Sequence, residues 1–113
     1  MNFLEAAKTA ALALDDKFGK EIVLLDISAV SSVCDYFVIT EAGNPNQVNA
    51  MVNGVEEAMT KFGLPLRHIE GRQRADWVLM DYGDIIIHIF NEESRAFYNL
   101  ERTWRDATIL SWS

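Results

Sequence analysis

Residues 75–90 read Ala75-Asp76-Trp77-Val78-Leu79-Met80-Asp81-Tyr82-Gly83-Asp84-Ile85-Ile86-Ile87-His88-Ile89-Phe90, and this stretch decides the fold. Two apolar runs flank a turn signal at 81–84, so the pattern predicts an antiparallel hairpin. If Asp81 lies opposite Asp84, Met80 pairs with Ile85 and Trp77 pairs with His88.

The predicted hairpin has two different faces, because side chains alternate along a strand. One face is wholly aliphatic and is explained by a core: Val78, Met80, Ile85, Ile87 and Ile89. The other face is apolar but carries polar groups, and we expect it to meet a partner: Trp77, Leu79, Asp81, Asp84, Ile86, His88 and Phe90.

The first half of the chain predicts two helices and two strands. Asn2 caps a helix over 2–18 that Gly19 ends, and Asn44, followed by Pro45, caps a second helix that ends at Gly63. Strands are predicted at 21–27 and 35–40, and their short connection makes them antiparallel. The core-facing stripes are Leu4, Ala7, Ala11, Leu14 and Phe18 in the first helix, and Val48, Met51, Val52, Val55 and Met59 in the second.

The second half adds a strand at 66–70, the hairpin and a last helix. With the second helix between them, strands 35–40 and 66–70 predict a right-handed β-α-β unit. Asn91 caps the last helix, in which Phe97, Leu100 and Trp104 share one face. Together these elements predict an α/β fold: a single domain over 1–107 with a mixed five-stranded sheet and flanking helices, and a tail over 108–113.

Composition narrows the class of partner. The 113 residues hold 10 basic and 17 acidic side chains, a net charge of −7. This balance disfavours broad nucleic-acid binding, which needs a basic stripe, and it permits a basic protein partner. Cys34 is the one cysteine, so no internal disulfide forms, as is typical of a reducing cytosol. Neither a targeting peptide nor a membrane-spanning run is evident, which predicts a cytoplasmic protein.

Several residues allow two interpretations. Trp77, with His88, is either an interface anchor or a core residue under Phe97, Tyr98 or Trp104. Asp81 and Asp84 favour turn formation over Mg²⁺ binding. His68 and His88 lack the spacing of a metal site, and Cys34 is best explained as a small buried thiol. Arg67, Arg72 and Arg74 form a mild basic cluster, either solvated or in contact with a phosphate.

The order and spacing of several motifs resemble the ribosomal silencing factor family, also called the RsfS, Iojap or DUF143 family. The resemblance covers about residues 2–107. It rests on DYFVIT at 35–40, NQV at 46–48 with Ala50, EG at 70–71, WVLMDYGDIIIHIF at 77–90, and RAFYNLE at 95–101 with Trp104.

The resemblance implies a translation repressor without catalytic activity. Such a factor binds the large ribosomal subunit through its ribosomal protein fourteen, blocks joining of the small subunit, and lowers translation when nutrients are scarce. Organelle relatives act in large-subunit assembly. The family fold is similar to that of nucleotidyltransferases, but this sequence has no Gly-Ser pair, and Asp81 and Asp84 lie three residues apart rather than in a DxD motif.

We therefore expect no catalytic residue, no cofactor and no metal. The alternatives are a nucleotidyltransferase-like enzyme and an assembly factor that contacts ribosomal RNA. The free chain is expected to be a monomer or a homodimer. The predicted partner-binding residues are Trp77, Leu79, Met80, Asp81, Tyr82, Asp84, His88, Tyr98 and Glu101.

Overall fold

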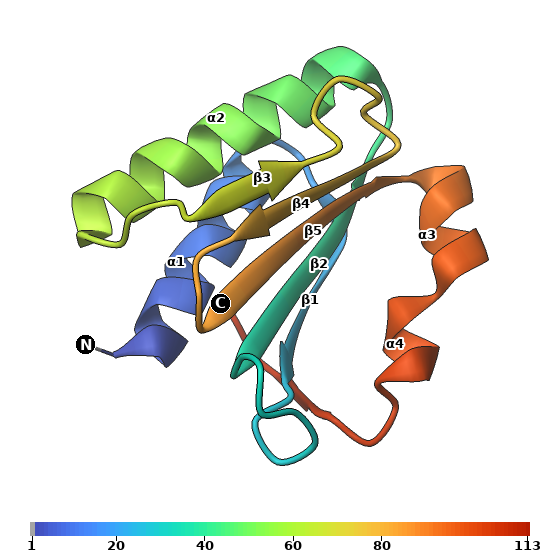
Figure 1. Cartoon of the computed structure of the whole chain (residues 1–113). Helices are drawn as coiled ribbons and strands as arrows, with labels where there is room; N and C mark the ends of the chain where they lie inside the picture. Colours follow the sequence, from blue (N-terminus) through green and yellow to red (C-terminus); the bar gives the residue numbers. More distant parts are fainter. Residues whose placement is uncertain (1) are drawn as a thin grey trace.

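Six strands form one mixed sheet with helices on both of its faces (Figure 1). The structure is a computed structural model, which describes residues 2–113. The elements in chain order are α1 (Phe3–Asp16), β1 (Lys20–Asp26), β2 (Tyr36–Ala42), α2 (Pro45–Phe62), β3 (His68–Glu70), β4 (Trp77–Asp81), β5 (Ile85–Asn91), α3 (Glu92–Tyr98), α4 (Leu100–Thr103) and β6 (Thr108–Leu110).

The α/β class and the mixed sheet are confirmed, but the sheet has six strands rather than five, and one predicted pair of neighbouring strands is not adjacent. The order across the sheet is β3-β4-β5-β2-β1-β6, in which only β2 and β5 are parallel neighbours. The expected antiparallel pairing of β1 with β2 is present. The predicted β-α-β partners, β2 and β3, are not adjacent, because the β4–β5 hairpin lies between them. Pairing β5 with β2 buries the isoleucine-rich strand in the middle of the sheet.

The hairpin register differs from the prediction by two residues. Trp77 pairs with Phe90 rather than His88, and Asp81 pairs with Ile86. Tyr82 donates its N–H to the Ile85 carbonyl at 2.9 Å, so the loop is Gly83-Asp84 alone. Gly83 has a φ of 90°, which a two-residue loop of this kind requires and glycine supplies without strain. Because the shift is even, both predicted faces keep their members.

Helices α1 and α2 cover the aliphatic face. Asn2 and Asn44 cap them, each side chain accepting from a backbone N–H three residues on. The stripe of α2 is buried as predicted. In α1 the prediction is wrong at the end: the helix stops at Asp16, and Phe18 has a positive φ and is 83% exposed. Gly19 serves close packing instead, since a Cβ there would lie 2.8 Å from Thr40 Oγ1.

The opposite face is covered only in part, by the two short helices α3 and α4 (Figure 1). Asn91 caps α3 as predicted, but Asn99 adopts a left-handed conformation, with a φ of 44°, and divides the expected single helix. Leu100 and Trp104 pack on a second, smaller core, whereas Phe97 is 80% exposed. The shared apolar face predicted for these three residues is therefore wrong.

The segment expected as a tail contributes to the sheet. Residues 108–110 form β6, which pairs antiparallel with β1. Trp112 then donates its indole N–H to the Ile22 carbonyl at 2.9 Å. Within residues 2–113, no helix has both the length and the apolar character needed to cross a bilayer.

Candidate partner-binding surface

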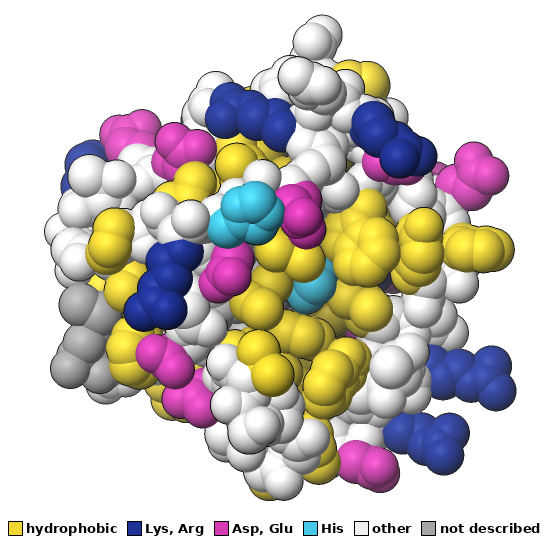
Figure 2. Space-filling model, in the orientation of Figure 1, with side chains coloured by type: hydrophobic (Ala, Val, Ile, Leu, Met, Phe, Trp, Pro, Cys, Tyr) yellow, Lys and Arg dark blue, Asp and Glu magenta, His cyan; other side chains and the backbone are white. Residues whose placement is uncertain are grey.

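Aromatic and apolar side chains gather on the face of the sheet that α3 and α4 leave partly open. We call this set the aromatic face; Figure 2 shows hydrophobic surface collected there, with carboxylates at its margin. The strands supply it by alternation, because every second residue of β4 and β5 points away from α1 and α2. Its members are Phe37, Trp77, Leu79, Ile86, His88, Tyr98 and the exposed Phe97.

Trp77 is the centre of this surface and is partly buried. Its ring stacks on the fully buried Phe90, with ring centroids 5.0 Å apart, and lies 4.5 Å from the ring of Tyr98. Tyr98 in turn meets Phe97 edge to face at 5.1 Å. Tyr98 is 45% exposed and Phe97 is 80% exposed, so a row of aromatic rings runs from the core to solvent. Tyr98 of α3 thus shelters Trp77 in part, as the core interpretation expected, and Trp77 also borders an open aromatic surface, so its role as an interface anchor stays a prediction.

His88 lies beneath the aromatic face and is 4% exposed. Its Nδ1 accepts a hydrogen bond from the Trp77 indole Nε1–H at 3.1 Å, and Phe37 packs edge to face on its ring at 4.6 Å. Burial lowers the pKa of His88 from 6.5 to about 4, since desolvation penalises the imidazolium. The histidine is therefore neutral near pH 7.

Acidic side chains lie at the hairpin end of the surface. Asp81 is opposite His68 across the β3–β4 pairing, and its carboxylate accepts from the Gly83 N–H at 2.7 Å. For Asp81, this bond is the predicted turn role. Glu70 meets His68 at 3.3 Å. Asp84 holds the chain by its backbone, because its carbonyl accepts from the Asp35 and Tyr36 N–H groups.

Three predicted contact residues lie below the surface. Met80 is 0% exposed and packs in the main core on the aliphatic face. Tyr82 is 2% exposed, because the shifted register places it opposite Ile85 on that same face. Burial raises the pKa of Tyr82 to about 12. The expectation that Tyr82 gives a rim contact is therefore corrected. Met80 and His88 are buried as well, so neither offers its side chain directly to a partner in this structure.

Glu101 belongs to a separate polar cluster around a buried arginine. Arg95 is 7% exposed and donates to the carbonyls of Lys20 at 3.2 Å and Glu21 at 2.7 Å. Its guanidinium also lies 3.4 Å from Glu41 and 3.7 Å from Glu101. These bonds tie α3 and α4 to β1 and β2. Glu101 thus holds the short helices on the sheet, a role that the sequence did not reveal.

Two features of the face were missed from the sequence. Phe37 joins it because β2 pairs with β5, which sets Phe37 beside Ile86. Phe97 joins it because the chain turns at Asn99. The aromatic block at 97–98, next to an asparagine that tolerates positive φ, was the available signal.

Features that would suit catalysis or metal binding are sparse in residues 2–113. No group of three or more metal-ligating side chains is present among them. Burial raises the pKa of the Cys34 thiol to about 11, so this cysteine is not an activated nucleophile. Of the predicted basic cluster, Arg72 is paired with Glu56 and Asn53, and Arg74 lies by Asp76.

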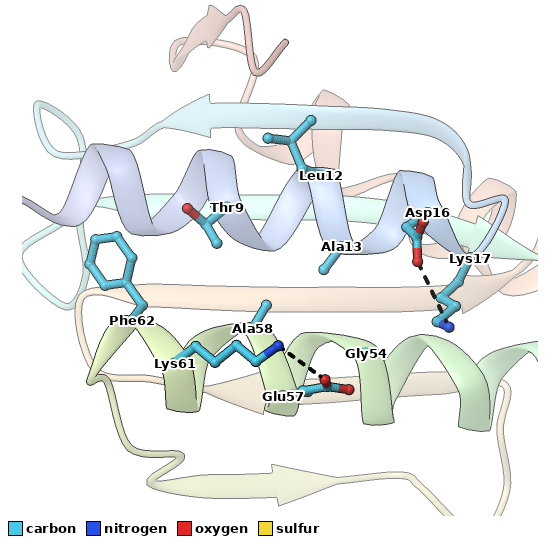
Figure 3. A pocket seen from close by; sticks show the side chains of 10 residues that line it. All are labelled: Thr9, Leu12, Ala13, Asp16, Lys17, Gly54, Glu57, Ala58, Lys61 and Phe62. Carbon is cyan, nitrogen blue, oxygen red and sulfur yellow. Dashed lines mark ion pairs between the residues drawn. The ribbon is translucent and has the colours of Figure 1, made fainter.

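A groove of about 530 Å³ separates α1 from α2 on the other side of the molecule (Figure 3). Its floor is apolar, with Ala13, Ala58 and Phe62, and its borders carry the ion pairs Lys61–Glu57 and Lys17–Asp16. Since its charges already pair within the chain, it offers no clear recognition chemistry.

The comparisons with known proteins agree with one another. The family model described as "Ribosomal silencing factor during starvation" matches residues 1–112. The ribosomal silencing factor RsfS of Bacillus subtilis is 38% identical over 109 residues, which cover 96% of this chain and 92% of that protein. The mouse protein "Mitochondrial assembly of ribosomal large subunit protein 1" is 28% identical over 89 residues, which cover 76% of this chain and 39% of the mouse protein.

Solved structures share the fold. A crystal structure of a Chromobacterium violaceum protein superposes with a TM-score of 0.89 at 32% identity, covering 92% of this chain and 87% of that one. A Bacillus halodurans protein gives a TM-score of 0.79, also at 32% identity, and covers 91% and 93% of the two chains.

Proposed function

Because this chain belongs to the ribosomal silencing factor family, we propose that it binds the large ribosomal subunit through its aromatic face and prevents the small subunit from joining. Its contact on the subunit is ribosomal protein fourteen. The action is steric: a folded domain occupies the joining surface, lowers translation when nutrients are scarce, and requires neither a cofactor nor a chemical step.

The observation that carries the proposal is the continuous row of Trp77, Tyr98 and Phe97. Tyr98 and Phe97 are exposed and Trp77 is partly so, and soluble chains seldom leave a contiguous aromatic patch open to solvent unless a partner covers it. Tryptophan and tyrosine also dominate the energetic centres of protein interfaces. A stable interface buries about 800 Å² on each partner, and the chain exposes 6360 Å² in all.

Charge supports a basic partner. The net charge is −7, and Asp81, Asp84 and Glu70 stand at the margin of the aromatic face. Ribosomal proteins are basic as a class because they neutralise RNA phosphates. Opposite charges at the margin speed association, while the apolar centre supplies most of the binding free energy.

The test is sedimentation of the chain with purified subunits in a sucrose gradient. The wild-type chain should migrate with the large subunit and not with the small one, and assembled ribosomes should bind it poorly. The Trp77→Ala variant should no longer migrate with the large subunit. The Phe18→Ala variant, which lacks an exposed aromatic ring outside the aromatic face, should still migrate with it. Equal recovery with both subunits would contradict occlusion.

A role in large-subunit assembly is the second candidate, favoured by the name of the mouse relative. It would use the same surface, and RNA contacts of Arg67, Arg72 and Arg74 would add to it. Nuclease treatment before a pull-down tests these RNA contacts, because protein-mediated binding survives the treatment and RNA-mediated binding does not. A nucleotidyltransferase activity would instead require nucleotide and Mg²⁺ binding in calorimetry, which we expect to be absent.

A further inference from the structure

The hydrogen bond between Trp77 and His88 defines the protonation of a buried histidine. An indole nitrogen only donates, so His88 Nδ1, at 3.1 Å from Trp77 Nε1, carries no proton. The neutral ring therefore holds its proton on Nε2. That Nε2–H is buried and has no hydrogen-bond partner in residues 2–113. An unsatisfied buried donor costs free energy, which an apolar residue at this position would avoid.

The same bond restrains the indole of Trp77. Phe90 stacks on the ring and Tyr98 lies beside it, but contacts between ring faces fix no single atom of the indole. Within residues 2–113, the hydrogen bond to His88 is the one that ties a single atom of the indole to the sheet. It also consumes the sole polar group of Trp77, so the part left open presents carbon atoms alone.

We propose that His88 is a positioning residue for partner binding. Its unprotonated Nδ1 holds the Trp77 indole in the one orientation that a partner contacts, so that the exposed part of the indole is wholly apolar. This inference rests on the proposed function above. It assigns His88 no direct contact with the partner, in agreement with its 4% exposure. The proposal also explains why the polar imidazole of His88 lies among aromatic neighbours. Its buried N–H lowers stability, but its hydrogen bond orients Trp77.

The decisive comparison is His88→Asn against His88→Leu. Asparagine Oδ1 and leucine Cδ1 both stand where histidine Nδ1 stands, three bonds from Cα, so the two variants leave the same gap. Asparagine offers an acceptor to the indole and also brings an NH2 group with two donors, whereas leucine has neither. Leucine suits the apolar surroundings better, so the Leu variant should melt at the same temperature as the Asn variant or higher.

Binding to purified large subunits should follow the opposite order. We expect His88→Asn to stay within about threefold of the wild type, and His88→Leu to bind about tenfold more weakly, the scale of one lost hydrogen bond. A merely structural role would make affinity follow stability. Equal affinity of the two variants, or tighter binding by His88→Leu, would overturn the proposal.

NMR spectroscopy tests the hydrogen bond between Trp77 and His88 in the free protein, without ribosomal subunits. In ¹⁵N NMR spectra the Trp77 indole N–H should exchange slowly with solvent in the wild type and His88→Asn, and rapidly in His88→Leu. The Trp112 indole, bonded to the Ile22 carbonyl, is the internal control and should not change. A proton found on His88 Nδ1 in the wild type would refute the inference. If the wild type fails to bind subunits, the proposed function fails, and the positioning of Trp77 is judged by this NMR test alone.

Discussion

Replacing Trp77 with alanine tests the aromatic face most directly, because the loss of stability and the loss of partner affinity can be measured separately. The indole contributes to folding through its stack on Phe90, its contact with Tyr98 and its bond to His88. Aromatic pairs contribute about 0.5–1.5 kcal/mol each beyond area burial. A net hydrogen bond contributes about 0.5–1.5 kcal/mol. These three contributions add to ~1.5–4.5 kcal/mol. Since the indole is only partly buried, we expect the free energy of unfolding to fall by about 3 kcal/mol, at the low end of the ~3–5 kcal/mol for a fully buried aromatic residue.

Binding should fall independently of this loss. The exposed part of Trp77 lies at the centre of the aromatic face, and truncating a central aromatic anchor costs ~2 kcal/mol or more, about a thirtyfold change in dissociation constant. Urea unfolding would give the first quantity. Titration of large subunits, corrected for the folded fraction, would give the second. Phe90→Ala is the matched control, since it removes a ring that is 0% exposed and should lower stability without lowering the affinity of folded molecules as much.

One result would refute the reasoning. If Trp77→Ala lowers the melting temperature strongly while the folded fraction binds the subunit with unchanged affinity, Trp77 is a core residue under α3 and no anchor. Trp77→Phe refines the outcome, because it keeps a ring on Phe90 and removes the donor to His88. We expect its stability and its affinity to lie between those of the wild type and the alanine variant.

Three further predictions concern charge, pH and backbone. Because the pKa of His88 is lowered from 6.5 to about 4, the unfolded chain binds the extra proton first as pH falls. The neutral, buried imidazole therefore contributes stability that is fully present above pH ~6.5 and is lost as pH drops toward 4, by at most ~3 kcal/mol. Urea unfolding from pH 7 to pH 4 should show this fall in the free energy of unfolding, and the His88→Asn variant should lack the part that His88 contributes. Asp84→Lys should slow association with large subunits most at low salt while leaving the melting temperature nearly unchanged, and stopped-flow rates that match the wild type at low salt would contradict the steering role. Gly71→Ala should destabilise the fold by several kcal/mol, because Gly71 has a φ of 82° and a Cβ would lie 2.0 Å from the Trp77 carbonyl; a melting curve like that of the wild type would show that the loop before β4 rearranges freely.

Local features of this chain were predictable because a few neighbouring residues encode them. Asn2, Asn44 and Asn91 each cap a helix by accepting from a backbone N–H three residues later, a bond that forms within one turn. The buried stripe of α2 follows from the 3.6-residue period. The two faces of the hairpin follow from the two-residue period, and they survived the register error because the shift was even.

Other features depended on packing between distant segments. The sequence did not reveal that the hairpin enters the sheet between β2 and β3, because that order depends on which strands bury the isoleucines best. Asn99 divides the last helix, although its side chain also allows a helix to continue, and this break exposes Phe97. Arg95 pairs with Glu101 across a separation of six residues on two helices, which no local pattern indicated.

The sequence by itself determined the helix caps, the amphipathic stripes, the α/β class and the family to which the chain belongs, since each depends on patterns within one segment or on the order of motifs. The tertiary structure alone decided the strand order, the burial of Met80 and Tyr82, the sixth strand from residues 108–110, and the bond that joins Trp77 to His88. The physical reason is range. Backbone hydrogen bonds and side-chain periodicity act over three or four residues, whereas burial is a property of the whole fold and selects among arrangements that local patterns leave equal.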